Sequence, residues 1–265
     1  MDTPWQKQES SKPLFEDLLW SRPEQKSQAG KLLIVGGNAH AIAAPSEAFA
    51  IALKQGIGEV KAAMPDKTRK LLGPRIPVDI ELVASTPSGS FSAKAEQQVK
   101  SYIAWANATL FAGDIGRNSE TAILLETIAL KMPGLQIYTR DAADYFNASP
   151  KTVIDRPDTL LIVSLAQLQK YCRALSWPAA ITFDMGIGPL CTLLSELTST
   201  HKASFAVQYS NTIIVAVDGR VVITKLPAEP AHWRLRTAAA ASVWWLQNQS
   251  RPLEAIATAI TQLSW

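Results

Sequence analysis

Short apolar runs alternate with longer segments of helical spacing along most of this chain. The short runs are rich in Val, Ile and Leu, and the longer segments place apolar residues three or four positions apart. Such alternation is typical of a mostly parallel sheet flanked by helices, so we expect a three-layer α/β fold. The predicted strands span 31–37, 59–64, 79–85, 109–113, 135–139, 159–163, 179–185, 204–210, 212–218 and 220–226. The predicted helices span 45–55, 94–105, 119–131, 166–174, 192–200, 236–247 and 253–263.

A hairpin signal late in the chain interrupts the parallel pattern. Asp218-Gly219 stands between two runs of alternating apolar residues. Asp-Gly in a two-residue loop favours a hairpin because both residues tolerate positive φ. We therefore expect a late antiparallel hairpin in the otherwise parallel sheet.

The first 29 residues differ from the rest of the chain. They are polar and broken by Pro13 and Pro23, apart from the apolar stretch 14–20. We expect residues 1–29 to form a tail, with one turn of helix packed on the body, and residues 30–265 to form the domain. No apolar run approaches the roughly 18 residues of a membrane span. The N-terminus lacks a secretory signal pattern, so we expect a cytoplasmic protein without a membrane partner.

Composition describes an ordinary globular protein. The 265 residues are 47% hydrophobic, and 26 basic against 23 acidic residues give a formal charge of +3. These charges are scattered, so we expect no nucleic-acid partner. Patterns for zinc, calcium or hydrolase sites are missing, and we expect no metal. Cys172 and Cys191 lack CxxC spacing, so two free buried thiols are expected, with a disulfide as the alternative.

A glycine-bearing strand end is the first candidate site. The predicted strand 31–37 ends in Gly36-Gly37-Asn38 before a helix. Glycine lets a phosphate or carboxylate approach the backbone N–H groups, and a helix N-terminus favours negative charge. The alternative is a tight strand-to-helix turn without a ligand. His40 either lies over this turn or is an ordinary surface residue.

The run GKLLIVGGNAHAIAAPSEAFAIALKQGIGEVKAAMP, residues 30–65, resembles the opening of the ADP/ATP-dependent NAD(P)H-hydrate dehydratases, a branch of the ribokinase-like superfamily related to carbohydrate kinases. Members use ATP or ADP to phosphorylate the hydroxyl of hydrated NADH or NADPH, and phosphate then leaves. The resemblance extends in order to Trp265 and implies a ribokinase-like fold. It also implies that Gly36, Gly37, Asn38 and Ala44 lie beside a dinucleotide site.

Other family motifs are partly present. The run TLFAGDIGRNSET is similar to the family's GPGLGR turn, with Gly116 and Arg117 matching. Arg117 either binds an anionic ligand or is solvated in a helix-capping loop. Asp141 is the one acidic residue that remains of an Asp-Ala-Asp run. Ser164 begins the segment that replaces a Thr-Pro-His.

The nucleotide motif is more strongly changed. In the family, Lys-Gly-x-x-Thr precedes the late hairpin, and here only Thr212 matches. Gln208 removes a fixed positive charge from where nucleotide phosphates would lie, and Tyr209 adds bulk in place of a glycine.

The motif before the last long helix is lost entirely. The family's Gly-x-Gly-Asp aligns with Trp233, Arg234, Leu235 and Arg236. In ribokinase-like enzymes these glycine N–H groups bind the transferred phosphoryl group, and the aspartate accepts a proton. Arginine has no acceptor lone pair and a pKa above about 12, so it cannot be that base. Arg234 and Arg236 either bind an anion, form a salt bridge to a residue such as Glu229, or are solvated.

Two aspartates are candidates for a substitute base. Asp184 is expected at the end of the predicted strand 179–185, at the mouth of the sheet, and Asp141 follows an earlier strand. The alternative is that each is an ordinary turn residue. Trp244-Trp245 must direct adjacent indoles to different faces of a helix, one into the core and one toward an expected homo-oligomer contact.

The sequence therefore predicts a divergent relative of NAD(P)H-hydrate dehydratase that has lost phosphoryl transfer. It would be a ligand-binding or scaffold pseudoenzyme, or an enzyme reworked for another small-molecule reaction. The alternative is an active nucleotide-dependent dehydratase, a carbon–oxygen lyase, or a small-molecule kinase with a substitute base. ATP or ADP and hydrated NAD(P)H are expected cofactor and substrate only if the family's function is retained. Otherwise the expected partner is a small-molecule ligand, with a dinucleotide as the class that the resemblance implies.

Overall fold

A computed structural model of the chain describes residues 5–182 and 184–265. Its strands form one ten-stranded sheet in the order β1-β10-β9-β8-β7-β6-β5-β2-β3-β4. The strands are β1 (Trp5–Glu9), β2 (Lys31–Gly36), β3 (Glu59–Pro65), β4 (Ile80–Val83), β5 (Ala108–Gly113), β6 (Leu135–Thr139), β7 (Thr159–Val163), β8 (Ser204–Tyr209), β9 (Thr212–Val217) and β10 (Arg220–Lys225). Neighbours pair in parallel from β4 to β8, whereas β9 is antiparallel to both β8 and β10.

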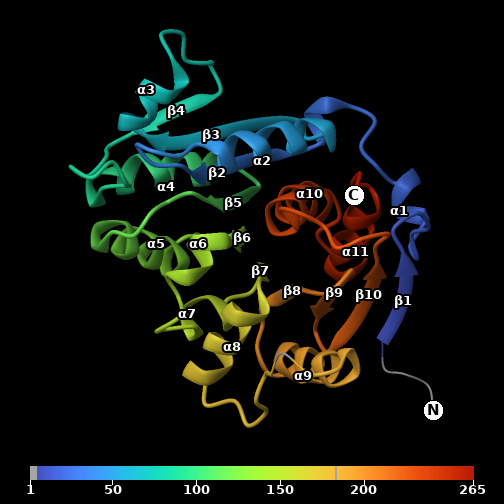
Figure 1. Cartoon of the computed structure of the whole chain (residues 1–265). Coiled ribbons are helices and arrows are strands. Elements are labelled where there is room, and N and C mark those ends of the chain that lie inside the picture. The colour runs from blue at the N-terminus through green and yellow to red at the C-terminus, as the bar shows by residue number, and fades with distance from the viewer. Residues whose placement is uncertain (1–4, 183) are drawn as a thin grey trace.

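Helices cover both faces of the sheet, so the three-layer α/β prediction is confirmed (Figure 1). The α-helices are α1 (Asp17–Trp20), α2 (Ala43–Lys54), α3 (Arg69–Leu72), α4 (Glu96–Trp105), α5 (Ser119–Lys131), α6 (Arg140–Asp144), α7 (Lys151–Ile154), α8 (Leu165–Ala174), α9 (Ile187–Thr200), α10 (Trp233–Gln247) and α11 (Pro252–Thr261), with 3₁₀ turns at Lys26–Gln28, Asp66–Thr68 and Ala93–Ala95. Within the described residues, no helix combines the length and apolar character needed to cross a bilayer.

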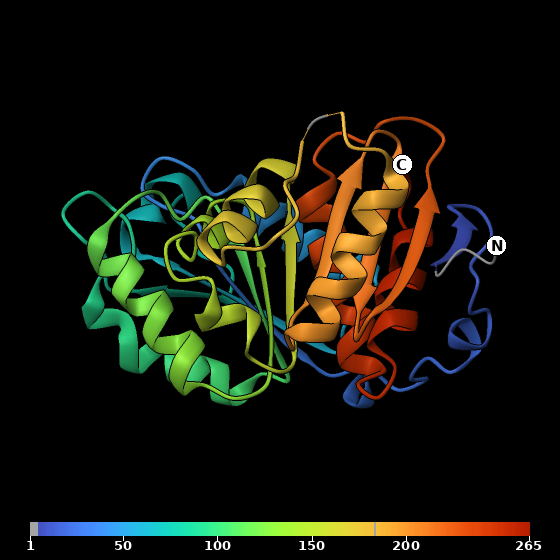
Figure 2. The same ribbon diagram turned by 90° about the horizontal axis from the view of Figure 1, so that it is seen from below.

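The sheet curves around α10 and α11, while α9 lies against β9 and β10 on the opposite face (Figures 1 and 2). The four alanines Ala238 to Ala241 are fully buried, and their small side chains let α10 approach β5, β6 and β7. The segment 238–246 of α10 is buried and almost wholly apolar, as expected for a helix segment in such an enclosed position. This packing fixes the start of α10 at one edge of the sheet.

The predicted hairpin is confirmed, with Asp218 and Gly219 at φ 47° and 76° between β9 and β10. The predicted strand 179–185 is wrong. Residues 179–182 and 184–185 form no strand, and Phe183 lies outside the described residues. Because β7 pairs directly with β8, the sheet has no position for another strand between them.

The N-terminal segment contributes a strand that the sequence did not predict. The run WQKQE has no apolar alternation, yet it forms β1 and pairs in parallel with the edge strand β10. Its neighbour in sequence, α1, buries Leu18 against the body. An edge position fits this polar sequence, since charged side chains such as Lys7 are typical of edge strands, whose outer backbone groups stay unpaired by the sheet.

Both tryptophans of the Trp244-Trp245 pair are buried, at 1% and 4% exposure. The prediction that one indole is available for an oligomer contact is therefore wrong. The Trp244 indole donates a 2.8 Å hydrogen bond to Gln55 Oε1, and the Arg22 guanidinium lies 4.5 Å from its ring centre. The curved sheet and α2 enclose α10, so opposite faces of this helix are both interior.

Cys172 and Cys191 are buried free thiols, as predicted. They lie on α8 and α9, within the hydrophobic cluster on the outer face of the sheet.

Candidate functional site

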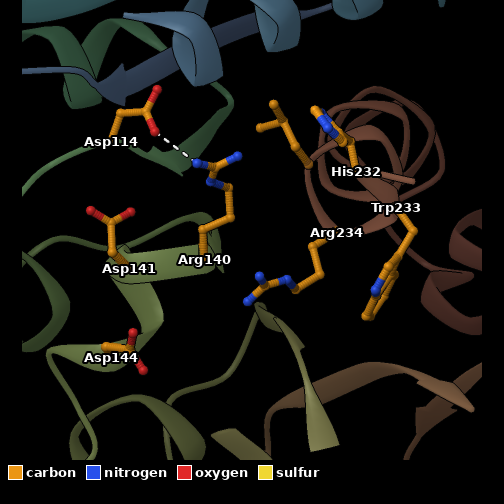
Figure 3. Close-up of a pocket in the computed structure, with 8 residues that line it drawn as sticks. Asp114, Arg140, Asp141, Asp144, His232, Trp233 and Arg234 are labelled. Atoms are coloured by element: carbon orange, nitrogen blue, oxygen red, sulfur yellow. Dashed lines mark hydrogen bonds and ion pairs between the residues drawn. The ribbon is translucent and has the colours of Figure 1, made fainter. Parts of the chain in front are cut away.

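A cavity of about 450 Å³ lies at the carboxyl ends of β5 and β6, next to the start of α10. We call it the α10 cavity. Its lining residues are Asp114, Arg140, Asp141, Asp144, His232, Trp233, Arg234 and Leu235 (Figure 3). The carboxyl ends of parallel strands are where ligands bind in α/β sheets of this kind.

One wall of the α10 cavity is organised by Asp114. Its Oδ1 accepts a 2.7 Å hydrogen bond from the Arg140 guanidinium, and its Oδ2 accepts a 2.7 Å bond from the Ala44 N–H. The Asn38 amide donates to the Asp114 carbonyl at 2.5 Å. The loop after β2 is thereby joined to the residues that follow β5 and β6.

Three residues that line the cavity have left-handed backbone angles. Asp114, Arg140 and His232 have φ values of 56°, 55° and 54°. Residues other than glycine adopt this region rarely, at a cost of about 1 to 2 kcal/mol each. Strained backbone of this kind concentrates at ligand sites. Gly113 is constrained as well, because a Cβ there would lie 2.7 Å from Asp141 Oδ1.

Asp141 has two differently used carboxylate oxygens. Its Oδ2 accepts hydrogen bonds from the N–H groups of Ile115 and Gly116, at 2.9 and 3.0 Å. Its Oδ1 is buried and has no hydrogen-bond partner within the described residues. Asp141 therefore fixes the turn after β5 through one of its two carboxylate oxygens.

Arg234 projects from α10 toward the aspartates (Figure 3). Its guanidinium donates a 2.9 Å hydrogen bond to Gln167 Oε1, and Gln167 Nε2 in turn donates to the Arg140 carbonyl and to Asp144 Oδ1. Burial lowers the pKa of Arg234, and the charge of Arg140 acts in the same direction. Arginine nevertheless stays protonated in proteins. In the described part of the chain this cation forms no ion pair.

The start of α10 adds backbone donors to this wall. His232 precedes the helix without a side-chain cap, and the N–H groups of Trp233, Arg234 and Leu235 have no acceptor within the described residues. Unpaired N–H groups and the helix dipole together favour an anion at this position. Arg234 and the helix start thus form a cationic wall opposite a carboxylate wall.

Arg236 does not contribute to this wall. Its guanidinium donates to the Ser264 carbonyl and lies 5.3 Å from the Trp265 ring centre. Glu229 is exposed and forms no ion pair among the described residues, so the alternative of a salt bridge to it is not found. Arg236 is held by the C-terminal segment, which the sequence did not indicate.

The structure brings together several residues that were singled out by sequence. Gly36, Gly37, Asn38 and Ala44 meet the turn after β5, where the Gly37 N–H donates to the Gly113 carbonyl. Gly116 lies beside Asn38: a Cβ atom at Gly116 would be 3.7 Å from the Asn38 amide nitrogen.

Other candidates lie elsewhere. Arg117 and His40 are exposed, while Thr212 lines a different cavity together with β1. Asp184 is exposed before α9, and a hydrogen bond from Thr182 lowers its pKa, which weakens it as a base.

Four residues of the site were not predicted as functional. Asp114 and Arg140 directly follow strands, so their position at the carboxyl edge was a usable signal. Gln167 belongs to a Ser-x-x-Gln capping box with Ser164 at the start of α8, also a local pattern. Asp144 is the last residue of the short helix α6 and faces the cavity. No local sequence pattern marks this position.

The site offers binding groups for an anion and for hydrogen-bond donors. Its aspartates include no set of three or more that is arranged to hold a metal ion, a statement that covers residues 5–182 and 184–265.

The fold is similar to those of several solved structures. A ribokinase-like superfamily protein from Enterococcus faecalis superposes with a TM-score of 0.74 over 98% of this chain and 86% of that one, at 13% identity. The fold is ribokinase-like. ADP/ATP-dependent NAD(P)H-hydrate dehydratase from Bacillus subtilis, crystallised with ATP and Mg²⁺, has a TM-score of 0.62 at 12% identity, with 94% and 86% of the two chains covered. Phosphomethylpyrimidine kinase from Clostridium difficile has a TM-score of 0.52 at 9% identity, with 88% and 100% covered.

No family model and no curated protein matches the chain by sequence. At identities this low, the structural likeness establishes the fold alone.

Proposed function

We propose that this chain binds a small anionic molecule in the α10 cavity and does not transfer phosphoryl groups by the ribokinase route. The observation that carries the proposal is Arg234, a charged guanidinium held in the cavity by a neutral amide, beside N–H groups of α10 that have no acceptor among the residues the structure describes. Two guanidinium groups, those of Arg140 and Arg234, face the cavity, but Asp114 already neutralises the first. The Arg234 charge is therefore available to a ligand, because this guanidinium forms no ion pair in the described part of the chain.

The proposed lack of phosphoryl transfer rests on the missing base. No Asp or Glu occurs between Glu229 and Glu254, so α10 carries no carboxylate whatever the alignment register. General-base assistance contributes roughly 10²- to 10⁴-fold to such reactions.

A second candidate is an enzyme that uses Asp141 as base. Its buried Oδ1, which has no hydrogen-bond partner among the described residues, supports this alternative. Against it stands the structural role of Oδ2, which accepts hydrogen bonds from two backbone N–H groups and thereby holds the turn after β5.

Anion binding is tested by isothermal titration calorimetry with inorganic pyrophosphate, ADP and ATP. We expect Arg234→Gln to weaken binding about 10- to 100-fold, as for a lost charged hydrogen bond. Arg236→Gln is the matched control, since this residue lies on the same helix but points to the C-terminus. Equal effects of the two variants, or none, would refute the site.

Catalysis is tested separately with hydrated NADH plus ATP or ADP, followed by nicotinamide absorbance. We expect no turnover above background. If the protein turns over this substrate and Asp141→Asn abolishes the turnover, the second candidate function replaces the first.

A further inference from the structure

A second and larger cavity, of about 690 Å³, lies between β1, the end of β10 and the start of α9. We call it the β1 cavity. Its size falls within the range of small-molecule sites, about 300 to 1,000 Å³. Residues 5–14 form much of its wall, and these precede the region that resembles hydrate dehydratases.

The wall formed by the N-terminal segment is firmly attached. Gln8 is 6% exposed, and its amide donates 2.8 Å hydrogen bonds to Thr224 Oγ1 and to the Ala257 carbonyl. Its Oε1 accepts a 2.9 Å bond from the Leu14 N–H. A fully satisfied buried amide therefore fastens β1 and the following turn to β10 and α11.

Part of the β1 cavity is apolar. The Trp5 indole approaches Gly188 in the first turn of α9, within 3.7 Å of the position of a Cβ there. Ile187, Ile223 and Leu14 complete this surface. Leu14 is 40% exposed, so part of this apolar surface is open to a ligand.

The remaining wall is cationic. Three lysines, Lys7, Lys12 and Lys225, line the β1 cavity, whereas Glu9 is the one carboxylate in its lining among the described residues. Within the described residues these four side chains form no ion pair, although β1 pairs Glu9 opposite Lys225. A ligand with an apolar body and an anionic group matches both parts of the wall.

We propose that the β1 cavity binds a small amphipathic monoanion, with its apolar body against Trp5 and Ile187 and its anionic group among the lysines. This site is separate from the α10 cavity and does not depend on the proposed function there. Because its wall belongs to β1, ligand binding also stabilises the pairing of β1 with β10.

Decanoate is the probe, and uncharged decanol is its matched analogue. By calorimetry on the full chain, we expect decanoate to bind at least about tenfold more tightly than decanol. Raising salt from about 50 to about 500 mM should weaken decanoate binding and leave decanol binding unchanged. Hydrogen exchange of the Trp5–Glu9 amides should slow when decanoate is bound.

The variants separate charge from folding. Lys7→Glu combined with Lys225→Glu should weaken decanoate binding about tenfold or more, while Lys202→Glu, an exposed lysine outside the cavity, should not. Gly188→Leu should block binding by filling the cavity beside Trp5. Circular dichroism checks that each variant is folded. Arg234→Gln should leave decanoate binding unchanged, which distinguishes this site from the α10 cavity.

Two results would overturn the proposal. One is equal affinity for decanoate and decanol, or an unchanged affinity in the folded double variant. The other is a protein that does not bind decanoate but binds AMP in a manner that requires Lys7 and Lys225. That result would assign the cavity to a nucleotide.

Discussion

The Arg140 guanidinium donates a 2.7 Å hydrogen bond to Asp114 although both residues hold left-handed backbone angles, φ 55° and 56°. The pair lies just beyond the ends of β5 and β6, and the second carboxylate oxygen of Asp114 holds the N–H of Ala44. Three loops therefore meet at one carboxylate. The arrangement keeps the edge of the α10 cavity in place before any ligand arrives.

Replacing this carboxylate should destabilise the protein. We expect Asp114→Asn to lower the free energy of unfolding by about 1 to 3 kcal/mol, because a charge-assisted bond and a loop contact both weaken. Urea denaturation measures the change. A double-mutant cycle with Arg140→Gln should give a coupling energy of at least about 0.5 kcal/mol. Simple additivity would show that the two residues do not act as a pair.

The left-handed angle of His232, φ 54°, predicts a difference between two small replacements. Glycine adopts this angle freely, whereas alanine is strained there by about 1 to 2 kcal/mol. We therefore expect His232→Gly to be more stable than His232→Ala by about 1 kcal/mol. The His232 side chain is 70% exposed, so both variants lose little packing. Equal unfolding midpoints for the two would be inconsistent with this backbone angle.

The buried Trp244 indole should contribute through both its area and its N–H group. Trp244→Phe leaves the Gln55 amide oxygen without its donor and weakens the cation–π interaction with Arg22. We therefore expect the free energy of unfolding to fall by about 1 to 3 kcal/mol. Trp20→Phe is the control, because Trp20 is 87% exposed and should change stability by less than about 0.5 kcal/mol. Similar losses in both variants would contradict the burial of Trp244.

Stability should fall in alkaline solution. Burial raises the pKa of the Cys172 and Cys191 thiols to about 11, and it also raises the pKa of Tyr138 and Tyr171. An unfolded thiol ionises near its ordinary pKa of 9.0. The unfolded state therefore releases protons first, so stability is full below about pH 9 and falls as pH rises toward 11.

Urea unfolding midpoints at pH 8, 9.5 and 11 check this expectation. Cys172→Ala with Cys191→Ala should reduce the decline relative to pH 8, while the tyrosines maintain part of it. A decline already present between pH 7 and 8 would point to other groups.

Local patterns sufficed for most elements because each depends on nearby residues. The predicted helix 119–131 matches α5 to the residue, since Asn118 caps it and an apolar face repeats along it. The Asp-Gly hairpin likewise follows from two adjacent residues. The predicted strand 179–185 failed because its apolar run was read without knowing that β7 and β8 already pair.

The candidate site divides in the same way. Sequence alone established that α10 carries no acidic residue and that glycines end β2 and β5, because these are facts of residue type and local backbone freedom. Only the tertiary structure decided that Arg234 enters the cavity while Arg236 turns to Ser264, and that polar β1 completes the sheet. Such outcomes depend on contacts between residues far apart in the chain, whose partners no local spacing specifies.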